Sequence, residues 1–95
     1  MSGYIIADVQ VTDATQYEDY KKWSGAAMLA HGAEVCVRGG ALQVLEGDWS
    51  PKRIVILKFS SMAAARAFYD TPEYQRAKDA RQDAAIMRMI AVEGI

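Results

Sequence analysis

The apolar residues change their period early in the chain, and this change restricts the possible folds more than any other feature. Over Tyr4–Val11 a period of two places Ile5, Ala7, Val9 and Val11 on one face and Tyr4, Ile6, Asp8 and Gln10 on the other, which is typical of a β-strand. The next apolar positions recur every three or four residues, the spacing of one helix face: Tyr17, Tyr20, Trp23, Ala27 and Ala30. Asp13 suits the N-cap of this helix, with Gln16 placed to complete a capping box, and Gly32 suits its C-cap. We therefore predict a strand followed by a helix over about residues 14–31, with the apolar helix face in the core.

The remaining apolar runs predict more strands and a second helix that is broken in the middle. Arg53–Phe59 is apolar nearly throughout, which is typical of a central strand covered on both faces. A serine, Ser60 or Ser61, caps the following helix, and Thr71 restarts it just before a proline. Ala85–Gly94 supplies the last strand. The order β-α-β-β-α-β is that of an α+β, ferredoxin-like split βαβ fold with a four-stranded antiparallel sheet.

Gly39 and Gly40 lie between two apolar runs whose alternation reverses across them. They fit either a two-residue hairpin turn or a bulge within one long strand. A hairpin would reverse the chain once more and send the next strand in the wrong direction, so the topology favours the bulge. We predict one bent strand over about Ala33–Glu46, followed by a loop over Glu46–Arg53 with Trp49 at its tip.

Charge and cysteine content restrict the partners and the compartment. The net charge is −1, with acids and bases interspersed, so neither nucleic acid nor a membrane surface is an expected partner. No apolar run approaches the roughly 20 residues that span a bilayer. The single cysteine, Cys36, lies between valines and is expected to pack as a small apolar side chain. Without an intrachain disulfide or a signal-peptide pattern, we expect a cytoplasmic protein.

One face of the predicted sheet has no helix to cover it. Residues 1–95 are expected to form a single domain in which both helices cover the same face. The other face would carry Tyr4, Ile6 and their neighbours, which are too apolar to stay in contact with water. Because apolar residues make up 52% of the chain, a second copy could cover this surplus. We expect a homodimer that pairs through the open sheet face.

Three stretches of the sequence resemble a known family. The runs VRGGALQVLEGDWSPKRIVILKF and YDTPEYQRAKDARQDAA, followed by a terminal VEG, resemble the domain-of-unknown-function 1330 family over essentially the whole chain. The resemblance implies a dimeric α+β barrel, whose ferredoxin-like subunits pair through their open sheet faces. Distant members of that group include cofactor-free monooxygenases, haem-degrading oxygenases and muconolactone isomerases, which hold ligands between the sheet and the helices. None of their catalytic motifs is present here, so the resemblance supplies no catalytic residue, and we expect no cofactor.

Two residues are weak candidates for proton transfer. His31 is the only histidine, which excludes a catalytic triad or a metal site with several histidines, and no metal is expected. It could act alone as a base or simply interact with the helix C-terminus. Asp8 is expected to point into the barrel, where burial would raise its pKa, or to pair with Arg88 on the last strand.

Arginines and aromatic residues near the glycine pair are the candidates for ligand binding. Arg38 and Arg53 could hold a carboxylate with paired hydrogen bonds, although Arg53 could instead pair with Glu46 or Asp48. Trp49 and Tyr74 could line a pocket or an interface. We therefore predict binding of a small organic acid between sheet and helices. The alternatives are a non-catalytic assembly module and a cofactor-free oxygenase or isomerase.

Overall fold

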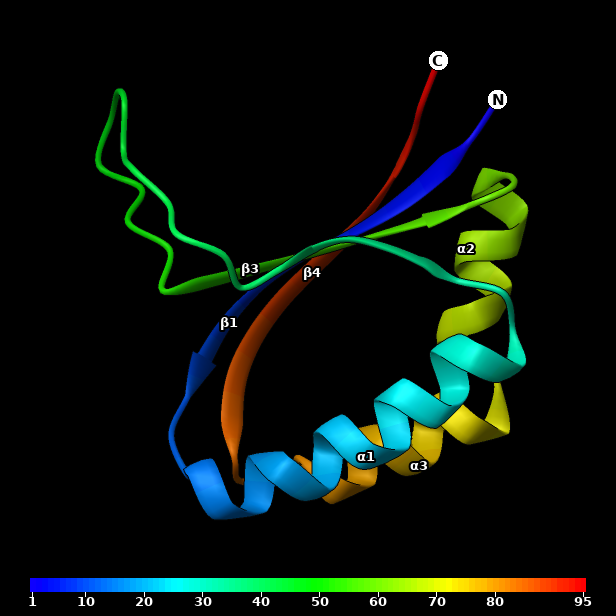
Figure 1. Cartoon of the computed structure of the whole chain (residues 1–95), viewed down its shortest axis with the longest axis horizontal. Helices are drawn as coiled ribbons and strands as arrows, with labels where there is room; N and C mark the ends of the chain where they lie inside the picture. Colours follow the sequence, from blue (N-terminus) through cyan, green and yellow to red (C-terminus); the bar gives the residue numbers. More distant parts are fainter.

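The chain, described here over residues 1–95 by a computed structural model, forms a four-stranded antiparallel sheet with three helices on one face (Figure 1). Its elements are β1 (Gly3–Val11), α1 (Ala14–Ala30), β2 (Glu34–Arg38), β3 (Arg53–Phe59), α2 (Met62–Tyr69), α3 (Pro72–Ala80) and β4 (Ala85–Glu93). The strand order is β2-β3-β1-β4, so β3 returns between β2 and β1. The predicted ferredoxin-like fold is confirmed.

The helices begin where the capping residues predict. The side-chain oxygens of Asp13, Ser61 and Thr71 each accept a hydrogen bond from the backbone N–H three residues later, at 3.1, 3.0 and 3.2 Å. Gly32, with φ at 69°, ends α1 in the left-handed conformation. The expected capping box is only half formed, because the backbone N–H of Asp13 donates to the carbonyl of Ala84 at 3.0 Å. That bond joins the start of α1 to the start of β4.

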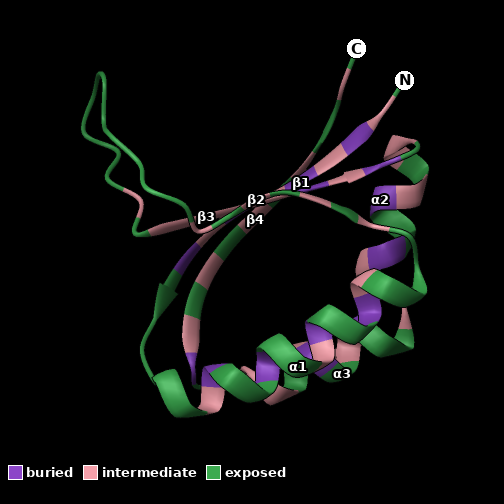
Figure 2. Cartoon of the chain, viewed as in Figure 1, coloured by how far each residue is buried: buried purple, intermediate pink, exposed green.

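Alternation along β1 separates the core from the opposite sheet face. Ile5, Ala7 and Val9 are buried and form part of the core beneath the sheet. They pack with Tyr17, Tyr20, Phe68 and Tyr74 from the helices. Figure 2 shows the buried segments on the strands and on the helices that cover them. On the outer face the apolar side chains are half-buried or exposed: Tyr4, Ile6, Val37, Ile54, Ile56, Ile86, Ile90 and Val92. A large apolar surface is therefore left without a layer over it.

The predicted bent strand over Ala33–Glu46 is wrong. β2 ends at Arg38, and residues 39–52 form a loop that extends away from the helices (Figure 1). The irregularity in the β2–β3 pairing lies between Val35 and Val37, not at the glycines. Because Arg38 already pairs with Val55, only two residues of β3 lie beyond that pair. Residues 40–46 therefore have no strand with which to continue the ladder.

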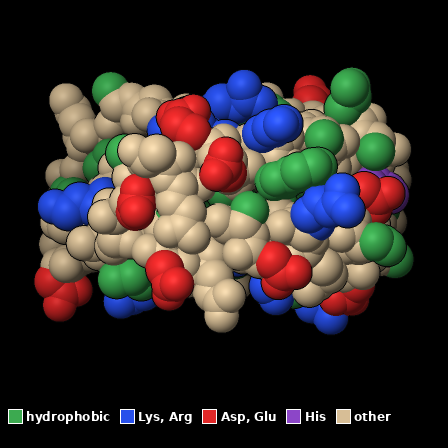
Figure 3. Space-filling view, turned by 90° about the horizontal axis from the view of Figure 1, so that it is seen from below, with side chains coloured by type: hydrophobic (Ala, Val, Ile, Leu, Met, Phe, Trp, Pro, Cys, Tyr) green, Lys and Arg blue, Asp and Glu red, His purple; other side chains and the backbone are tan.

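The helical side of the molecule carries acidic and basic side chains interspersed with each other (Figure 3). None of the three helices combines the length and the apolar character required to cross a membrane.

Two glycine substitutions are expected to change stability in opposite directions. A Cβ at Gly3 would overlap the backbone carbonyl of Ser61, so Gly3→Ala should lower the free energy of unfolding by about 1–3 kcal/mol. A Cβ at Gly25, in the middle of α1, meets no atom within 4 Å, so Gly25→Ala should raise it by about 1 kcal/mol. Urea denaturation of both variants measures the two shifts. Equal effects would contradict the close approach of β1 to α2.

Candidate functional site

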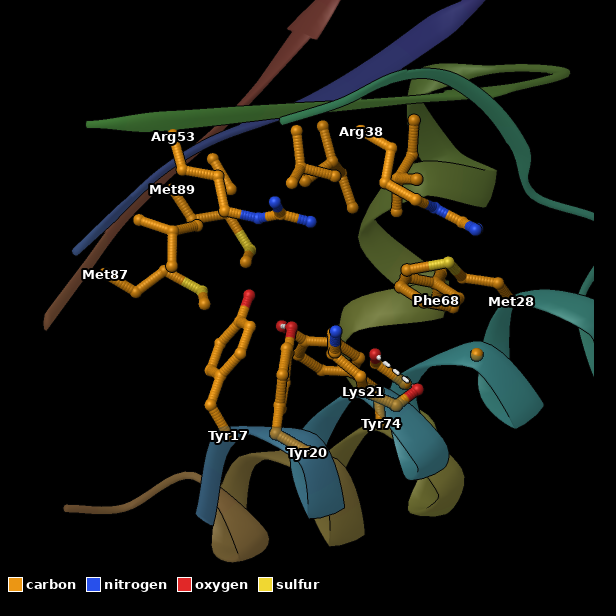
Figure 4. Close-up of a pocket in the computed structure, with 17 residues that line it drawn as sticks. Tyr17, Tyr20, Lys21, Met28, Arg38, Arg53, Phe68, Tyr74, Met87 and Met89 are labelled. Atoms are coloured by element: carbon orange, nitrogen blue, oxygen red, sulfur yellow. Dashed lines mark hydrogen bonds between the residues drawn. The ribbon is translucent and has the colours of Figure 1, made fainter. Parts of the chain in front are cut away.

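A cavity of about 310 Å³ lies between the inner face of the sheet and the helices (Figure 4). Twelve of its 17 lining residues are hydrophobic. Small side chains on both sides leave the space: Ala7 in the middle of the sheet, and Ser24 and Gly25 on α1. Larger side chains here would fill the volume, whereas Met28 from α1 and Met87 and Met89 from β4 form flexible apolar walls. The volume is at the lower end of the range for small-molecule sites.

Three cationic side chains line the cavity, and no acidic residue does. The strand register directs two of them inward: Arg38 pairs with Val55 on the inner face, and Arg53 pairs with Val9. Both extend from the sheet toward the helices (Figure 4). Arg38 is exposed and Arg53 is half-buried, so the two lie at different depths. Lys21, the third cation, already pairs with Glu18 at 2.9 Å.

The two arginines form no ion pair with the chain's own acids. The alternative pairing of Arg53 with Glu46 or Asp48 is not formed, since the ion pairs of the chain are Lys21–Glu18, His31–Glu73 and Arg66–Asp70. The Nε of Arg53 is buried and has no hydrogen-bond partner. Positive charge is thus directed into the cavity without compensation.

Gly39 sets the position of the Arg53 side chain. Its φ is 66°, a conformation that favours glycine, and its N–H donates to the carbonyl of Ile54 at 2.8 Å. A Cβ at this position would overlap the Arg53 guanidinium. The absence of a side chain at Gly39 therefore makes room for the arginine.

Tyrosine hydroxyls from the helices face these cations across the cavity. Tyr17, Tyr20 and Tyr74 all line it, and the hydroxyls of Tyr20 and Tyr74 share a buried hydrogen bond of 3.0 Å (Figure 4). Burial, and then the neighbouring Tyr74, raises the pKa of Tyr20 far above its ordinary value. The Arg81 guanidinium lies 5.5 Å from the centre of the Tyr20 ring. Tyr20 therefore stays protonated and acts as a hydrogen-bonding group.

Asp8 and Trp49 lie outside this cavity. Both border a separate, polar hollow on the outer side of the sheet, together with Arg88. The indole Nε1 of Trp49 donates a hydrogen bond to Oδ2 of Asp8 at 3.1 Å. The alternative pairing of Asp8 with Arg88 is not formed, although the two residues are opposite each other in the β1–β4 register.

His31 and Cys36 also lie away from the cavity lining. His31 caps the end of α1, and its Nε2 is 3.1 Å from Oε2 of Glu73 in the first turn of α3. The backbone N–H of Glu73, and then His31, lowers the pKa of that carboxyl group. Cys36 was expected to pack as a small apolar side chain, but it is exposed because it lies at the bulge in β2.

Of the four predicted ligand-binding residues, the structure brings Arg38, Arg53 and Tyr74 to one cavity and leaves Trp49 on the other side of the sheet. Tyr17 and Tyr20 were assigned only to the core. Their hydroxyls, on an otherwise apolar helix face, were the available signal for a polar cavity. No three histidine, cysteine or carboxylate side chains gather in a way that could hold a metal ion.

Comparison with known proteins places this chain among α+β proteins of ferredoxin-like fold. It is similar to a protein of unknown function, RPA0582, from Rhodopseudomonas palustris (22% identity, TM-score 0.77, covering 99% of this chain and 82% of that one). It is also similar to SnoaB, a cofactor-independent oxygenase from Streptomyces nogalater (15% identity, TM-score 0.67, covering 99% of this chain and 93% of that one). A third similar structure is a dimeric ferredoxin-like protein of unknown function from Thermobifida fusca (16% identity, TM-score 0.65, covering 99% of this chain and 92% of that one). At these identities the likeness shows the fold alone.

The chain belongs to the family described as "Domain of unknown function (DUF1330)", which matches residues 2–95. A search of curated proteins finds no match.

The tyrosine pair should behave as one unit in stability measurements. Tyr20→Phe removes one hydroxyl and leaves that of Tyr74 buried without a partner, which costs about 1–3 kcal/mol. Tyr20→Phe/Tyr74→Phe removes both, so it should cost less than the sum of the two single substitutions. Denaturation of the three variants measures this coupling. Strict additivity would show that the two hydroxyls do not interact.

Stability should fall at alkaline pH partly because of Tyr20. The native state holds the Tyr20 proton more tightly than the unfolded chain, in which the pKa is near 10.0. The stability that this tighter proton binding contributes to the native state is fully present below pH 10.0 and is lost as the pH rises above it. The free energy of unfolding, measured against pH, should therefore decrease less steeply in Tyr20→Phe than in the wild type. Parallel curves would contradict the raised pKa.

Proposed function

We propose that the protein binds a small organic acid with an apolar body in the cavity beneath the sheet. The carboxylate interacts with Arg38 and Arg53, and the body lies among the apolar and methionine side chains. One observation carries this assignment: two arginines without ion-pair partners line a largely apolar cavity that contains no acid.

Charge and hydrogen bonding favour an anion over a neutral ligand. A partly buried guanidinium group without a counter-charge is unfavourable, and the buried Nε of Arg53 has no hydrogen-bond partner. A carboxylate offers two oxygens whose geometry matches the guanidinium donors, and such charge-assisted hydrogen bonds are the stronger kind. A bound acid would therefore supply what Arg53 lacks.

The tyrosines support a second polar group on the ligand. Tyr20 and Tyr74 have one hydroxyl hydrogen each, and their mutual hydrogen bond uses one of the two. The other hydrogen and the remaining lone pairs can interact with a hydroxyl or carbonyl group of the ligand. Since these residues extend from the helices and the arginines from the sheet, the two polar groups would lie at opposite sides of the ligand.

Binding without chemistry fits the cavity better than base catalysis does. No histidine, cysteine or carboxylate side chain lines it, and these are the types that ordinarily act as bases near neutral pH. The two candidate bases, Asp8 and His31, do not line it. The oxygenase or isomerase alternative would need a proton acceptor from the ligand itself. The similarity to a cofactor-independent oxygenase is one of fold, and fold alone is a weak basis for function.

The same proposal includes a homodimer that pairs through the outer sheet face. Exposed Ile86, Ile90 and Val92 make this face apolar, and the similar Thermobifida fusca protein is described as dimeric.

A thermal-shift comparison of acids with their neutral amides tests the ligand class. Benzoate, octanoate and related monocarboxylates should include at least one that raises Tm, whereas the matching amide should not, because the amide cannot pair with the arginines. Arg38→Gln and Arg53→Gln should each weaken binding by about 10-fold or more, since a hydrogen bond to a charged group contributes roughly 1.5–3 kcal/mol.

Arg76→Gln is the matched control, because Arg76 lies over the Trp23 ring at 4.8 Å and does not line the cavity. Equal shifts from acids and amides would exclude the proposed recognition. A set of acids that leaves Tm unchanged would favour the non-catalytic assembly module instead.

A further inference from the structure

The loop over residues 39–52 carries apolar side chains that nothing in the chain covers. All residues from 40 to 50 are exposed. Leu45 is 91% exposed and Trp49 is 58% exposed, with Leu42 and Val44 also exposed beside them. Residues 40–52 make no backbone hydrogen bond, and their one side-chain bond joins Trp49 to Asp8. A loop so weakly held is expensive to order, unless another surface packs against it.

The surface of the chain is larger than that of a compact monomer. The chain exposes 6269 Å², whereas a folded monomer of its 10.5 kDa mass is expected to expose about 5,400 Å². A protruding loop and a sheet with one uncovered face are the features that enlarge it, and both carry exposed apolar residues. Apolar surface of this kind favours contact with another protein surface.

The loop and the outer face are placed so that two copies complement each other. The loop's own Trp49 contacts the end of the outer face near Asp8 and Ile86. The opposite end, with Ile90 at 60% exposure and Val92, stays open. Figure 1 shows the loop and the chain termini at different ends of the sheet, both away from the helices. A two-fold axis that lies in the interface plane and is oblique to the strands would bring the loop of each copy over the open β4 end of the other.

The residues that flank the loop on its two sides are the arginines of the ligand cavity. Arg38 is the last residue of β2 and Arg53 the first of β3, so the loop joins them directly. Gly39, the first loop residue, lies against the Arg53 guanidinium. Ordering of the loop would therefore restrict the backbone next to both cations.

We propose, on the basis of the ligand site proposed above, that this loop is an arm that packs on the β4 end of the second copy's outer face, and that its docking completes the anion site by fixing Arg38 and Arg53. Acid binding and dimerisation are then linked. The ligand tightens the dimer by the same factor by which the dimer tightens ligand binding.

Charge substitutions at two equally exposed leucines test the arm. Leu45→Glu should raise the dimer dissociation constant at least 10-fold in sedimentation velocity, because it places a carboxylate in an apolar contact. Leu29→Glu is the matched control: Leu29 is 87% exposed on α1, on the helical side, and should leave the dimer unchanged. Neither side chain is buried in the subunit, so circular dichroism should show both variants folded. Equal dimer dissociation constants in the two variants would overturn the proposal that the loop packs against the second copy.

A spin label tests which copy the arm contacts. In a Cys36→Ser/Leu45→Cys protein, the label is attached at position 45, and this copy is mixed with an unlabelled ¹⁵N copy. Only contacts between copies are then visible. Amide signals of the ¹⁵N copy should broaden at Ile90 and Val92 and remain sharp on α1. Broadening that is absent from β4 means that the arm does not lie there, whatever the dimer constant.

The linkage is measured separately from the existence of the ligand site. With benzoate or octanoate, whichever binds more tightly, Leu45→Glu should weaken binding about 3- to 10-fold, and Leu29→Glu should not. Unchanged affinity in Leu45→Glu overturns the coupling while the ligand site stands. If neither probe binds the wild type, the proposed function and the coupling both fail, and the spin-label result alone decides the arm contact.

Discussion

Alternation along β1 is the constraint on which the other features depend. β1 lies in the middle of the sheet and pairs with β3 on one side and β4 on the other, so its register fixes which side chains of both neighbours face the helices. Val9, almost fully buried, has Arg53 and Met87 as its two partners. Asp8, one residue earlier, faces the opposite side and accepts the Trp49 hydrogen bond. A slip of one residue would exchange these two environments.

The cavity exists because small residues occupy positions at which larger side chains would fill the space between the sheet and the helices. Ala7 lies at the centre of the inner face, and Ser24 and Gly25 come from the helix above it. Around that space the chain places arginines on the sheet side and tyrosines on the helix side. Packing with larger aliphatic residues would raise stability by burying more apolar surface. The chain instead keeps polar groups beside a void, an arrangement that favours a ligand.

Local signals predicted the elements well because they involve residues close in sequence. Each helix start depends on one side-chain oxygen and an N–H three residues later, and the alternation of Tyr4–Val11 needs no distant partner. The loop after Arg38 was missed for the opposite reason. Alternation continues through Leu42 and Val44, but a strand also needs a neighbour to pair with, and β3 is too short to supply one. The sequence pattern shows which side chains could face each side of a strand. It does not show whether a neighbouring strand is present to form the hydrogen bonds.

The same distinction explains which site residues could be predicted. Arg53 lies in a regular strand, where alternation assigns it the same face as Val55 and Leu57, and Tyr74 follows a capped helix start. Arg38 reaches that face only because of the bulge between Val35 and Val37, which the alternation of the sequence does not reveal. Trp49 lies in a segment without regular structure, so no period assigns it to either face of the sheet. It joins the outer face through Asp8, a long-range contact between residues 41 positions apart.

Because β1 contributes Val9 to the cavity and Asp8 to the opposite surface, the two surfaces meet within one dipeptide. The loop repeats this arrangement: Arg53 at its base faces inward and Trp49 faces outward. A rigid strand cannot shift one of its faces without the other. Whatever covers the outer face therefore acts on the same backbone that positions the cations of the cavity. In a fold with a single helical layer, a partner on one sheet face would therefore act on residues that line the other.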